Sequence, residues 1–307
     1  MTETTPDRTV VMTGATSGLG EHAVHRIAAQ PNTDIIIGAR GHGRDVPEGS
    51  SVVSLDLSSL KSVRKFANVV TQRLGDDRID MLVLNAGMQS SNASQRSEDG
   101  FEKTFAVNHL GHYLLARELL PHLAEGARLV ITTSDTHDPE HFPFAPEELD
   151  IQKLAQPRTG RFNSGAYAAS KLCNILTARA LAELDEVKGR DIHVIAYNPG
   201  LTPDTSLGDD GSLLRGVLSR LMDSHPVRLG LSFASRFNPD MYPGTSERSG
   251  EVLAQVVLGE VTPPNDQIYV SLVKGQITFP EPSELARSDE VRDRLWRESA
   301  EMVGIEH

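Results

Sequence analysis

Tyr167 and Lys171 are the two residues of this chain whose types and spacing point most directly to chemistry. They lie four positions apart in a stretch with helical patterning, so their side chains share one face of a helix. A phenol has an ordinary pKa of about 10 and is a poor proton donor or acceptor near neutral pH, but a nearby ammonium group favours its charged form. The pair therefore suits a tyrosine that transfers protons as a general acid or base, with the lysine lowering its pKa.

A second pattern, of three glycines, suits the binding of phosphate groups. The apolar run at 9–12 predicts a first strand, and Gly14, Gly18 and Gly20 follow it directly, before a helix that we expect to begin near Glu21. In this context the backbone N–H groups of the turn and the N-terminus of the helix face a pyrophosphate. The alternative is a tight turn between strand and helix that binds nothing.

The elements that must position these residues follow from the apolar patterning. Short apolar runs alternate with helical stretches, which predicts an α/β doubly wound Rossmann fold: a seven-stranded parallel sheet with helices on both faces. Right-handed crossovers would bring the carboxyl ends of the strands, and the turns after them, to one edge of the sheet. We expect strands at 9–13, 34–38, 51–55, 81–85, 128–133, 193–198 and 267–272, and helices at 59–74, 104–123 and 166–184, within a single domain over 1–307.

Six motifs in fixed order resemble the short-chain dehydrogenase/reductase family, over roughly residues 7–272. They are Thr13-Gly14-Ala15-Thr16-Ser17-Gly18-Leu19-Gly20, Asn85-Ala86-Gly87, Asn108, Ser134, Tyr167-Ala168-Ala169-Ser170-Lys171 and Asn198-Pro199-Gly200. The resemblance implies an oxidoreductase that uses a nicotinamide cofactor, with Tyr167 as the general acid in carbonyl reduction and the general base in alcohol oxidation.

The resemblance also indicates which nicotinamide cofactor to expect. Ala39 stands where relatives that prefer NAD carry an acid, and the guanidinium of Arg40, which follows it, suits a 2′-phosphate. NADP(H) is therefore predicted over NAD(H), with an ordinary surface arginine as the alternative for Arg40. The other cofactor contacts implied by the resemblance are Gly14, Thr16, Ser17, Gly18, Leu19, Gly20, Asp56, Leu57, Asn85, Ala86, Gly87, Tyr167, Lys171, Pro199, Gly200 and Thr202.

Two of these contacts have open alternatives. Asp56 would accept a hydrogen bond from the adenine amine, but an acid at the N-terminus of a helix is nearly as good an interpretation. The family's threonine after Asn-Pro-Gly is replaced here by Asp204, so Thr202, Asp204 or Thr205 would contact the cofactor amide.

By the same resemblance, Asn108, Ser134, Tyr167 and Lys171 form the catalytic set. Ser134 would bind the substrate oxygen at the end of the strand expected at 128–133, with Thr133 as the fallback. Asn108 would kink a helix and hold a water that relays protons through Lys171, which would also hold the nicotinamide ribose.

Segments 107–117, 170–176 and 294–304 are more similar to the retinol dehydrogenase and protochlorophyllide reductase branch of the family. We therefore expect NADP(H)-dependent interconversion of a bulky apolar ketone or aldehyde and its alcohol. The enzyme alternative is a C=C reduction like that of protochlorophyllide reductase, although segment 135–165 lacks the cysteine that the photoenzyme is thought to use. The other alternative, a non-catalytic NADP(H)-sensing protein, would not need the intact catalytic set.

Two long excursions, at about 135–165 and 201–245, follow expected strands, and a helical extension is expected at about 283–307. The second excursion either closes the core or forms a lid over the substrate; its apolar residues are Leu213, Leu214, Val217, Leu218, Leu221, Met222, Phe233, Phe237, Met241 and Tyr242. The pairs His22/His25 and His109/His112 are interpreted as solvated or interface histidines rather than metal ligands.

The composition of the chain argues against some classes of partner and indicates the compartment in which we expect the protein. A formal net charge of -12 without a basic cluster argues against nucleic acid, and the absence of a run of about 18 apolar residues argues against a transmembrane segment. The single cysteine, Cys173, allows no intrachain disulfide, and the start of the chain does not resemble a signal peptide, so a cytoplasmic location is expected. Cys173 itself is expected to be a packed residue of its helix. The expected partner is a small-molecule substrate, and a homodimer with a second copy of the chain is possible.

Overall fold

The fold is built on one sheet of eight strands in the order β3-β2-β1-β4-β5-β6-β7-β8. The computed structural model describes residues 8–41, 46–90, 92, 94–157, 164–202, 244–265 and 267–306. The strands are β1 (Arg8–Thr13), β2 (Thr33–Ala39), β3 (Ser51–Ser54), β4 (Ile79–Leu84), β5 (Leu123–Thr132), β6 (His193–Asn198), β7 (Tyr269–Val273) and β8 (Gln276–Thr278). The doubly wound Rossmann fold is confirmed.

Seven of these strands pair in parallel, as expected, and β8 was not predicted. It pairs antiparallel with β7 through a hairpin whose turn residues, Lys274 and Gly275, have φ of 51° and 74°. Left-handed values at both turn residues match the twist of two adjacent strands. Because β8 is only three residues long, its side chains show too little alternation to predict a strand.

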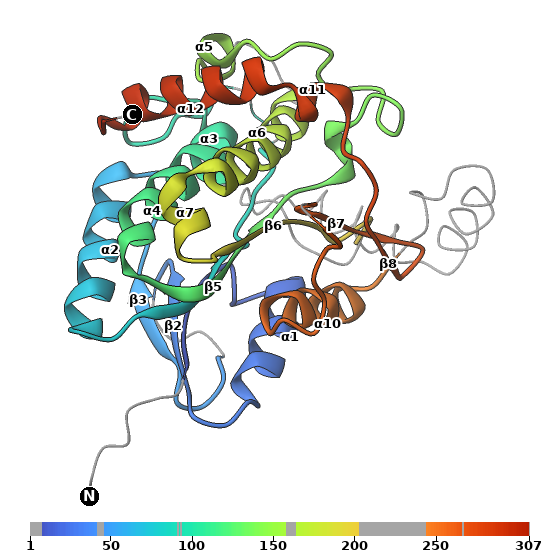
Figure 1. Ribbon diagram of the computed structural model, residues 1–307. Helices are drawn as coiled ribbons and strands as arrows, with labels where there is room; N and C mark the ends of the chain where they lie inside the picture. Colours follow the sequence, from blue (N-terminus) through green and yellow to red (C-terminus); the bar gives the residue numbers. More distant parts are fainter. Residues whose placement is uncertain are drawn as a thin grey trace, which may run out of the picture.

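Helices cover both faces of the sheet (Figure 1). Helices α1 and α10 lie side by side on one face, and α2, α4, α6 and α12 cover the other. The bounds are α1 (Gly18–Ala28), α2 (Leu60–Leu74), α3 (Lys103–Phe105), α4 (Gly111–Leu119), α5 (Ile151–Leu154), α6 (Ser164–Glu183), α7 (Asp185–Gly189), α10 (Ser246–Val257), α11 (Glu284–Arg287) and α12 (Asp289–Val303).

Alternation along each central strand separates the two hydrophobic layers. In β1, Val10 and Met12 face the layer beneath α1 and α10, whereas Val11 faces the layer beneath α2, α4 and α6. Successive side chains of a strand point to opposite faces, and both faces of a parallel sheet are buried, so the strands are apolar throughout. This packing fixes the register of the strands and hence the positions of the turns at their carboxyl ends.

The helix expected at 104–123 is interrupted. It consists of α3, a π-helical turn η1 (Ala106–Leu110), α4 and a 3-10 turn η2 (Leu120–His122), after which β5 begins at Leu123. Apolar periodicity predicts a helix but does not register the one extra residue of a π turn, which explains the difference. The interruption lies at Asn108, next to the site described below.

The two excursions differ in how much is described. The first contains the 3-10 turn η3 (Asp135–His137) and α5, and the C-terminal extension forms α11 and α12. Residues 203–243, which carry the apolar residues from Leu213 to Tyr242 as well as Asp204 and Thr205, lie outside the described residues. Among the residues that the structure does describe, no helix has the length and apolar character needed to span a membrane.

Candidate active site

A cleft of about 490 Å³ lies at the carboxyl ends of β1, β4, β5 and β6. It spans the point where the strand order reverses between β1 and β4, which is where open α/β sheets bind ligands. Of the predicted site residues, all but Asn108 line the cleft: Gly14, Thr16, Ser17, Gly18, Leu19, Gly20, Arg40, Asp56, Leu57, Asn85, Ala86, Gly87, Ser134, Tyr167, Lys171, Pro199, Gly200 and Thr202.

The glycine turn at one end of the cleft is packed too tightly for side chains. A Cβ on Gly14 would lie 2.6 Å from the backbone of Ala86, and one on Gly20 would lie 1.9 Å from the carbonyl oxygen of Gly14. Gly14 and Gly18 also have left-handed φ of 68° and 57°, which other residues adopt rarely. The turn therefore brings backbone N–H groups and the start of α1 to the surface of the cleft.

Arg40 and Asp56 lie at the end of the cleft formed by β2 and β3. Arg40 is exposed and directly follows β2, whereas Ala39 is buried. The carboxylate of Asp56 accepts hydrogen bonds from the backbone N–H and the hydroxyl of Ser58, at 2.9 and 2.7 Å. Asp56 thus caps the turn before α2 and also lines the cleft, so its two interpretations are compatible.

Asn85 lines the cleft and its side chain links the glycine turn to β5. Its amide donates to the Gly14 carbonyl at 3.0 Å and accepts from the Thr132 hydroxyl at 2.9 Å. The Thr13 hydroxyl oxygen accepts from the backbone N–H groups of Asn85 and Ala86, at 3.0 and 3.1 Å. The ends of β1, β4 and β5 are therefore held together by side-chain hydrogen bonds.

His112 extends this network to the π turn, a role that we did not predict. Its Nδ1 lies 3.2 Å from the Asn108 carbonyl oxygen, which can only accept, so Nδ1 carries the proton. Burial lowers the pKa of His112 to about 4, so the ring is neutral and its Nε2 accepts the Thr13 hydroxyl proton over 2.9 Å. The expectation of a solvated or interface histidine is wrong for His112, and also for His109, because both side chains are buried in the core.

Asn108 itself is fully buried and acts through its amide. It accepts from the Met88 backbone N–H at 2.8 Å, and donates to the Met88 carbonyl at 2.9 Å and to the Ser170 hydroxyl at 3.0 Å. The side chain thus ties the segment after β4 to the helix that carries Tyr167. Asn108 lies in the π turn, as the predicted kink requires, although it does not line the cleft.

Tyr167 and Lys171 project from one face of α6, and the Lys171 ammonium lies 5.7 Å from the centre of the Tyr167 ring. The ammonium is buried, donates to the Thr132 carbonyl at 3.1 Å, and has a pKa lowered by burial to about 8. Burial and then the charge of Asp135 raise the pKa of Tyr167, and a hydrogen bond with Ser134 opposes them. Tyr167 is therefore protonated at neutral pH, the state needed to donate a proton.

Ser134 follows β5, caps η3 and lies close enough to Tyr167 to oppose the rise in the pKa of that tyrosine. Its hydroxyl also lies 3.2 Å from a carboxylate oxygen of Asp135. Thr133, the fallback, is buried and donates its hydroxyl to the Lys171 carbonyl at 2.7 Å. The structure therefore brings Ser134 to Tyr167 and commits the Thr133 hydroxyl elsewhere.

Gly200 and Thr202 close the other side of the cleft. Gly200 has φ of 68°, and a Cβ there would lie 2.5 Å from the Leu272 carbonyl oxygen, so glycine is required by both conformation and space.

Cys173 is buried, and burial raises the pKa of its thiol, which confirms the expected packed cysteine. Within the described residues, no three His, Cys, Asp or Glu side chains gather as metal ligands.

Comparison with known proteins identifies the family. Residues 8–142 match the model of the short chain dehydrogenase family. The chain is 30% identical to human retinol dehydrogenase 13, over 99% of this chain and 86% of that protein, and 30% identical to the chloroplastic protochlorophyllide reductase B of Hordeum vulgare, over 96% and 78%. The structure of a short chain dehydrogenase from Burkholderia cenocepacia in complex with NADP aligns with a TM-score of 0.59 at 21% identity, covering 87% of this chain and 97% of that one. The chain belongs to the short-chain dehydrogenase family of oxidoreductases, in its retinol dehydrogenase-like branch.

Proposed function

We propose that this protein is an NADP(H)-dependent oxidoreductase that interconverts a bulky, largely apolar ketone or aldehyde and its alcohol. The observation that carries the proposal is the placement of Ser134, Tyr167 and Lys171 in one cleft with a glycine turn at its other end. The Ser134 hydroxyl lies close enough to Tyr167 to oppose the rise in its pKa, and both residues line the cleft, so one substrate oxygen can reach both hydroxyls.

The residues around the cleft fit a dinucleotide. The packed glycine turn presents N–H groups and the start of α1, which suit a pyrophosphate. A Cβ on Gly87 would lie 3.3 Å from the Lys171 ammonium, so glycine leaves this nitrogen open to a ribose hydroxyl. Arg40 supplies a cation beside Asp56 and Ser58, where the adenosine ribose would lie, and supports NADP(H) over NAD(H).

In the direction of reduction, Ser134 would donate a hydrogen bond to the substrate carbonyl and Tyr167 would transfer its proton to the same oxygen. When bound, a reduced nicotinamide supplies the hydride that reaches the carbonyl carbon. Lys171 would stabilise the phenolate that forms, because its ammonium lies close to the ring and is charged below pH 8. In alcohol oxidation Tyr167 would accept the proton instead.

The support for a bulky apolar substrate comes from the apolar residues among those that line the cleft. Val107, Met88 and Phe142 contribute apolar surface there, and each buried methylene of a ligand gains about 0.8 kcal/mol. Several of the relatives are retinol dehydrogenases by name, and retinol is a long apolar alcohol. Their names are consistent with a bulky apolar substrate. We further propose a cytoplasmic location, on the lone buried cysteine.

The direct test is NADPH consumption over a panel of ketones and aldehydes from acetone to fused-ring compounds, with Tyr167→Phe as the matched variant. We expect turnover to favour the larger members, and Tyr167→Phe to lower kcat by about 100-fold or more, because only the proton donor is lost. The Kd for NADPH should change less than about twofold. A variant that keeps most of its activity would contradict the proposed role of Tyr167.

A further inference from the structure

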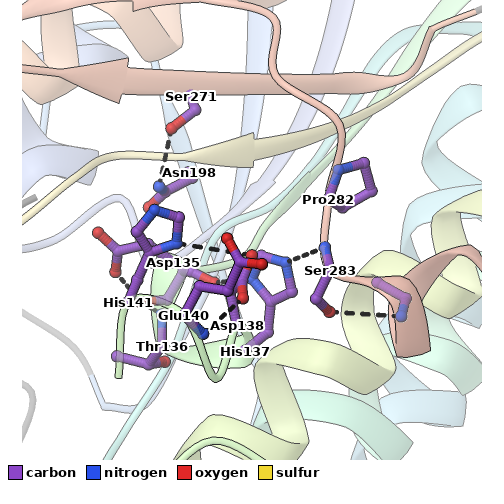
Figure 2. A network of polar contacts seen from close by, with 12 residues as sticks. Asp135, Thr136, His137, Asp138, Glu140, His141, Asn198, Ser271, Pro282 and Ser283 are labelled. Carbon is purple, nitrogen blue, oxygen red and sulfur yellow. Dashed lines mark hydrogen bonds and ion pairs between the residues drawn. The ribbon is translucent and has the colours of Figure 1, made fainter. Parts of the chain in front are cut away.

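His137 lies three residues after Ser134 and joins two segments that are far apart in the sequence. Its Nδ1 lies 2.7 Å from the Ser134 carbonyl oxygen, and its Nε2 accepts the backbone N–H of Ser283 at 3.3 Å. Figure 2 shows the imidazole of His137 beside Ser283, where the chain enters α11. The ring is buried and packs edge-on against Tyr269, with the ring centres 5.7 Å apart.

These two contacts determine the protonation of the ring. A carbonyl oxygen only accepts, so Nδ1 carries a proton, and a backbone N–H only donates, so Nε2 carries none. His137 is therefore the neutral Nδ1–H tautomer, and burial lowers its pKa in agreement with that state. Both ring nitrogens are used, so replacing the ring leaves a buried carbonyl or a buried N–H without its partner.

The contact on the serine side restrains the turn that holds the Ser134 hydroxyl. The Ser134 hydroxyl oxygen accepts the Thr136 backbone N–H at 3.3 Å, within the same 3-10 turn as His137. With the Ser134 carbonyl held by the imidazole, the backbone on the C-terminal side of Ser134 is fixed at a second point. This fixes the hydroxyl on the side of the cleft where Tyr167 lies, close enough to act on the pKa of the tyrosine.

The contact on the other side leads back to the helix of Tyr167. Ser283 caps α11, whose Ala286 carbonyl accepts from the guanidinium of Arg179 at 3.1 Å. Arg179 lies in α6, as Tyr167 does, and also pairs with Asp289 at 2.7 Å. The segment from Ser283 to Asp289 thus bridges the serine turn and the tyrosine helix.

We propose that His137 is a positioning residue that fixes the Ser134 hydroxyl relative to Tyr167, by joining the serine turn to the C-terminal segment that is bonded to α6. This rests on the proposed function, in which both hydroxyls bind one substrate oxygen. His137 is not one of the four catalytic residues. It acts on the reaction only by holding the Ser134 carbonyl.

Two conservative variants separate the two contacts. His137→Asn places an amide N–H near the position of Nδ1 and keeps the donor to Ser134, whereas His137→Gln places an acceptor near the position of Nε2 and keeps the contact to Ser283. We expect kcat for the fused-ring ketone α-tetralone to fall about tenfold in His137→Gln and about threefold in His137→Asn, in line with one lost buried hydrogen bond. His141→Gln, which changes an exposed histidine in the same segment, is the control and should keep the wild-type kcat.

A double variant tests whether His137 acts through Ser134. In a Ser134→Ala background, His137→Gln should lower kcat less than about twofold further, because the group that it positions is gone. A full tenfold loss in that background, or no loss in the single variant, would overturn the proposal. If Tyr167→Phe were as active as the wild type, the proposed function would fail instead, which keeps the two failures distinct.

The tautomer of the His137 ring can be measured in the wild-type protein without a substrate, so this test does not depend on the folding of a variant. In the ¹⁵N NMR spectrum of the histidine-labelled wild-type protein at neutral pH, His137 should have a protonated Nδ1 and a bare Nε2, and its pKa should lie below the ordinary value. A protonated Nε2, or titration of His137 near its ordinary pKa, would contradict the bridge to Ser283.

Discussion

At the scale of single residues, the site combines a phenol that is hard to ionise with an ammonium that is easy to deprotonate. Burial raises the pKa of Tyr167 and lowers that of Lys171 to about 8, so both side chains are poised nearer to a neutral state than in water. This suits a tyrosine that begins the reaction as an acid. It also means that Lys171 contributes its positive charge only below about pH 8.

Arg40 allows a sharp test of cofactor choice. We expect NADPH to bind the wild type more tightly than NADH by roughly 1.5 to 3 kcal/mol, if one charge-assisted contact to the 2′-phosphate carries the preference. Arg40→Ala should remove most of this difference and leave NADH affinity unchanged, and Ala39→Asp should reverse it by repelling the phosphate. Equal affinities for the two cofactors in the wild type, measured by calorimetric titration, would contradict the assignment.

At the scale of elements, the π turn η1 is held by side chains rather than by the pattern of its apolar residues. His112 bonds the Asn108 carbonyl on one side and the Thr13 hydroxyl on the other, and Thr13 holds the backbone of Asn85 and Ala86. The turn that follows β4 and the glycine turn after β1 therefore share one buried network with the interrupted helix. A change at His112 should reach the cofactor site although the residue does not line it.

We expect His112→Leu to lower the free energy of unfolding by about 1–3 kcal/mol, since buried partners lose their hydrogen bonds. The variant should also weaken NADPH binding, by about three- to tenfold, through the loosened Thr13 network. His109→Leu is the matched control, because the His109 ring bonds the Ser299 hydroxyl in α12 at 2.8 Å instead of Thr13. If both variants weakened NADPH binding equally, the effect would reflect general destabilisation.

The same elements show what the sequence can and cannot predict. Strand ends, the glycine turn, and the places of Ser134 and Tyr167 follow from apolar runs, from glycine spacing and from the family motifs, because these depend on nearby residues. The π turn, the short strand β8 and the contacts of His112 and His137 depend on partners far away in the sequence, at Thr13 and Ser283. Periodicity carries no information on such partners.

At the scale of the whole molecule, the fold buries neutral histidines in the layer that packs against the sheet. Burial lowers the pKa of His109 to about 3 and that of His112 to about 4, whereas both would titrate near 6.5 in the unfolded chain. Below pH 6.5 the unfolded state therefore binds more protons than the folded state, and stability falls as the pH falls. This contribution is complete above pH 6.5 and is lost progressively toward pH 4.

Urea unfolding between pH 7 and pH 5 should show this loss, at roughly 1 kcal/mol per pH unit for each of the two histidines. His109→Asn should reduce the slope, whereas His22→Asn, a change at an exposed histidine, should leave it unchanged. A stability that stays constant from pH 6.5 to pH 5 would show that these rings are not held in the neutral state.

The transfer of deuterium from labelled NADPH to a carbonyl tests the central proposal most directly. The wild type would be incubated with NADPH deuterated at C4 on either face and a panel of fused-ring and long-chain ketones and aldehydes, with mass spectrometry of the alcohols. We predict one deuterium on the carbinol carbon of the bulky products, from one face of the cofactor only, and labelling that is about 100-fold slower or more with Tyr167→Phe although that variant binds NADPH. A wild-type protein that binds NADPH and labels no alcohol, or a Tyr167→Phe variant that labels it at the wild-type rate, would contradict the account.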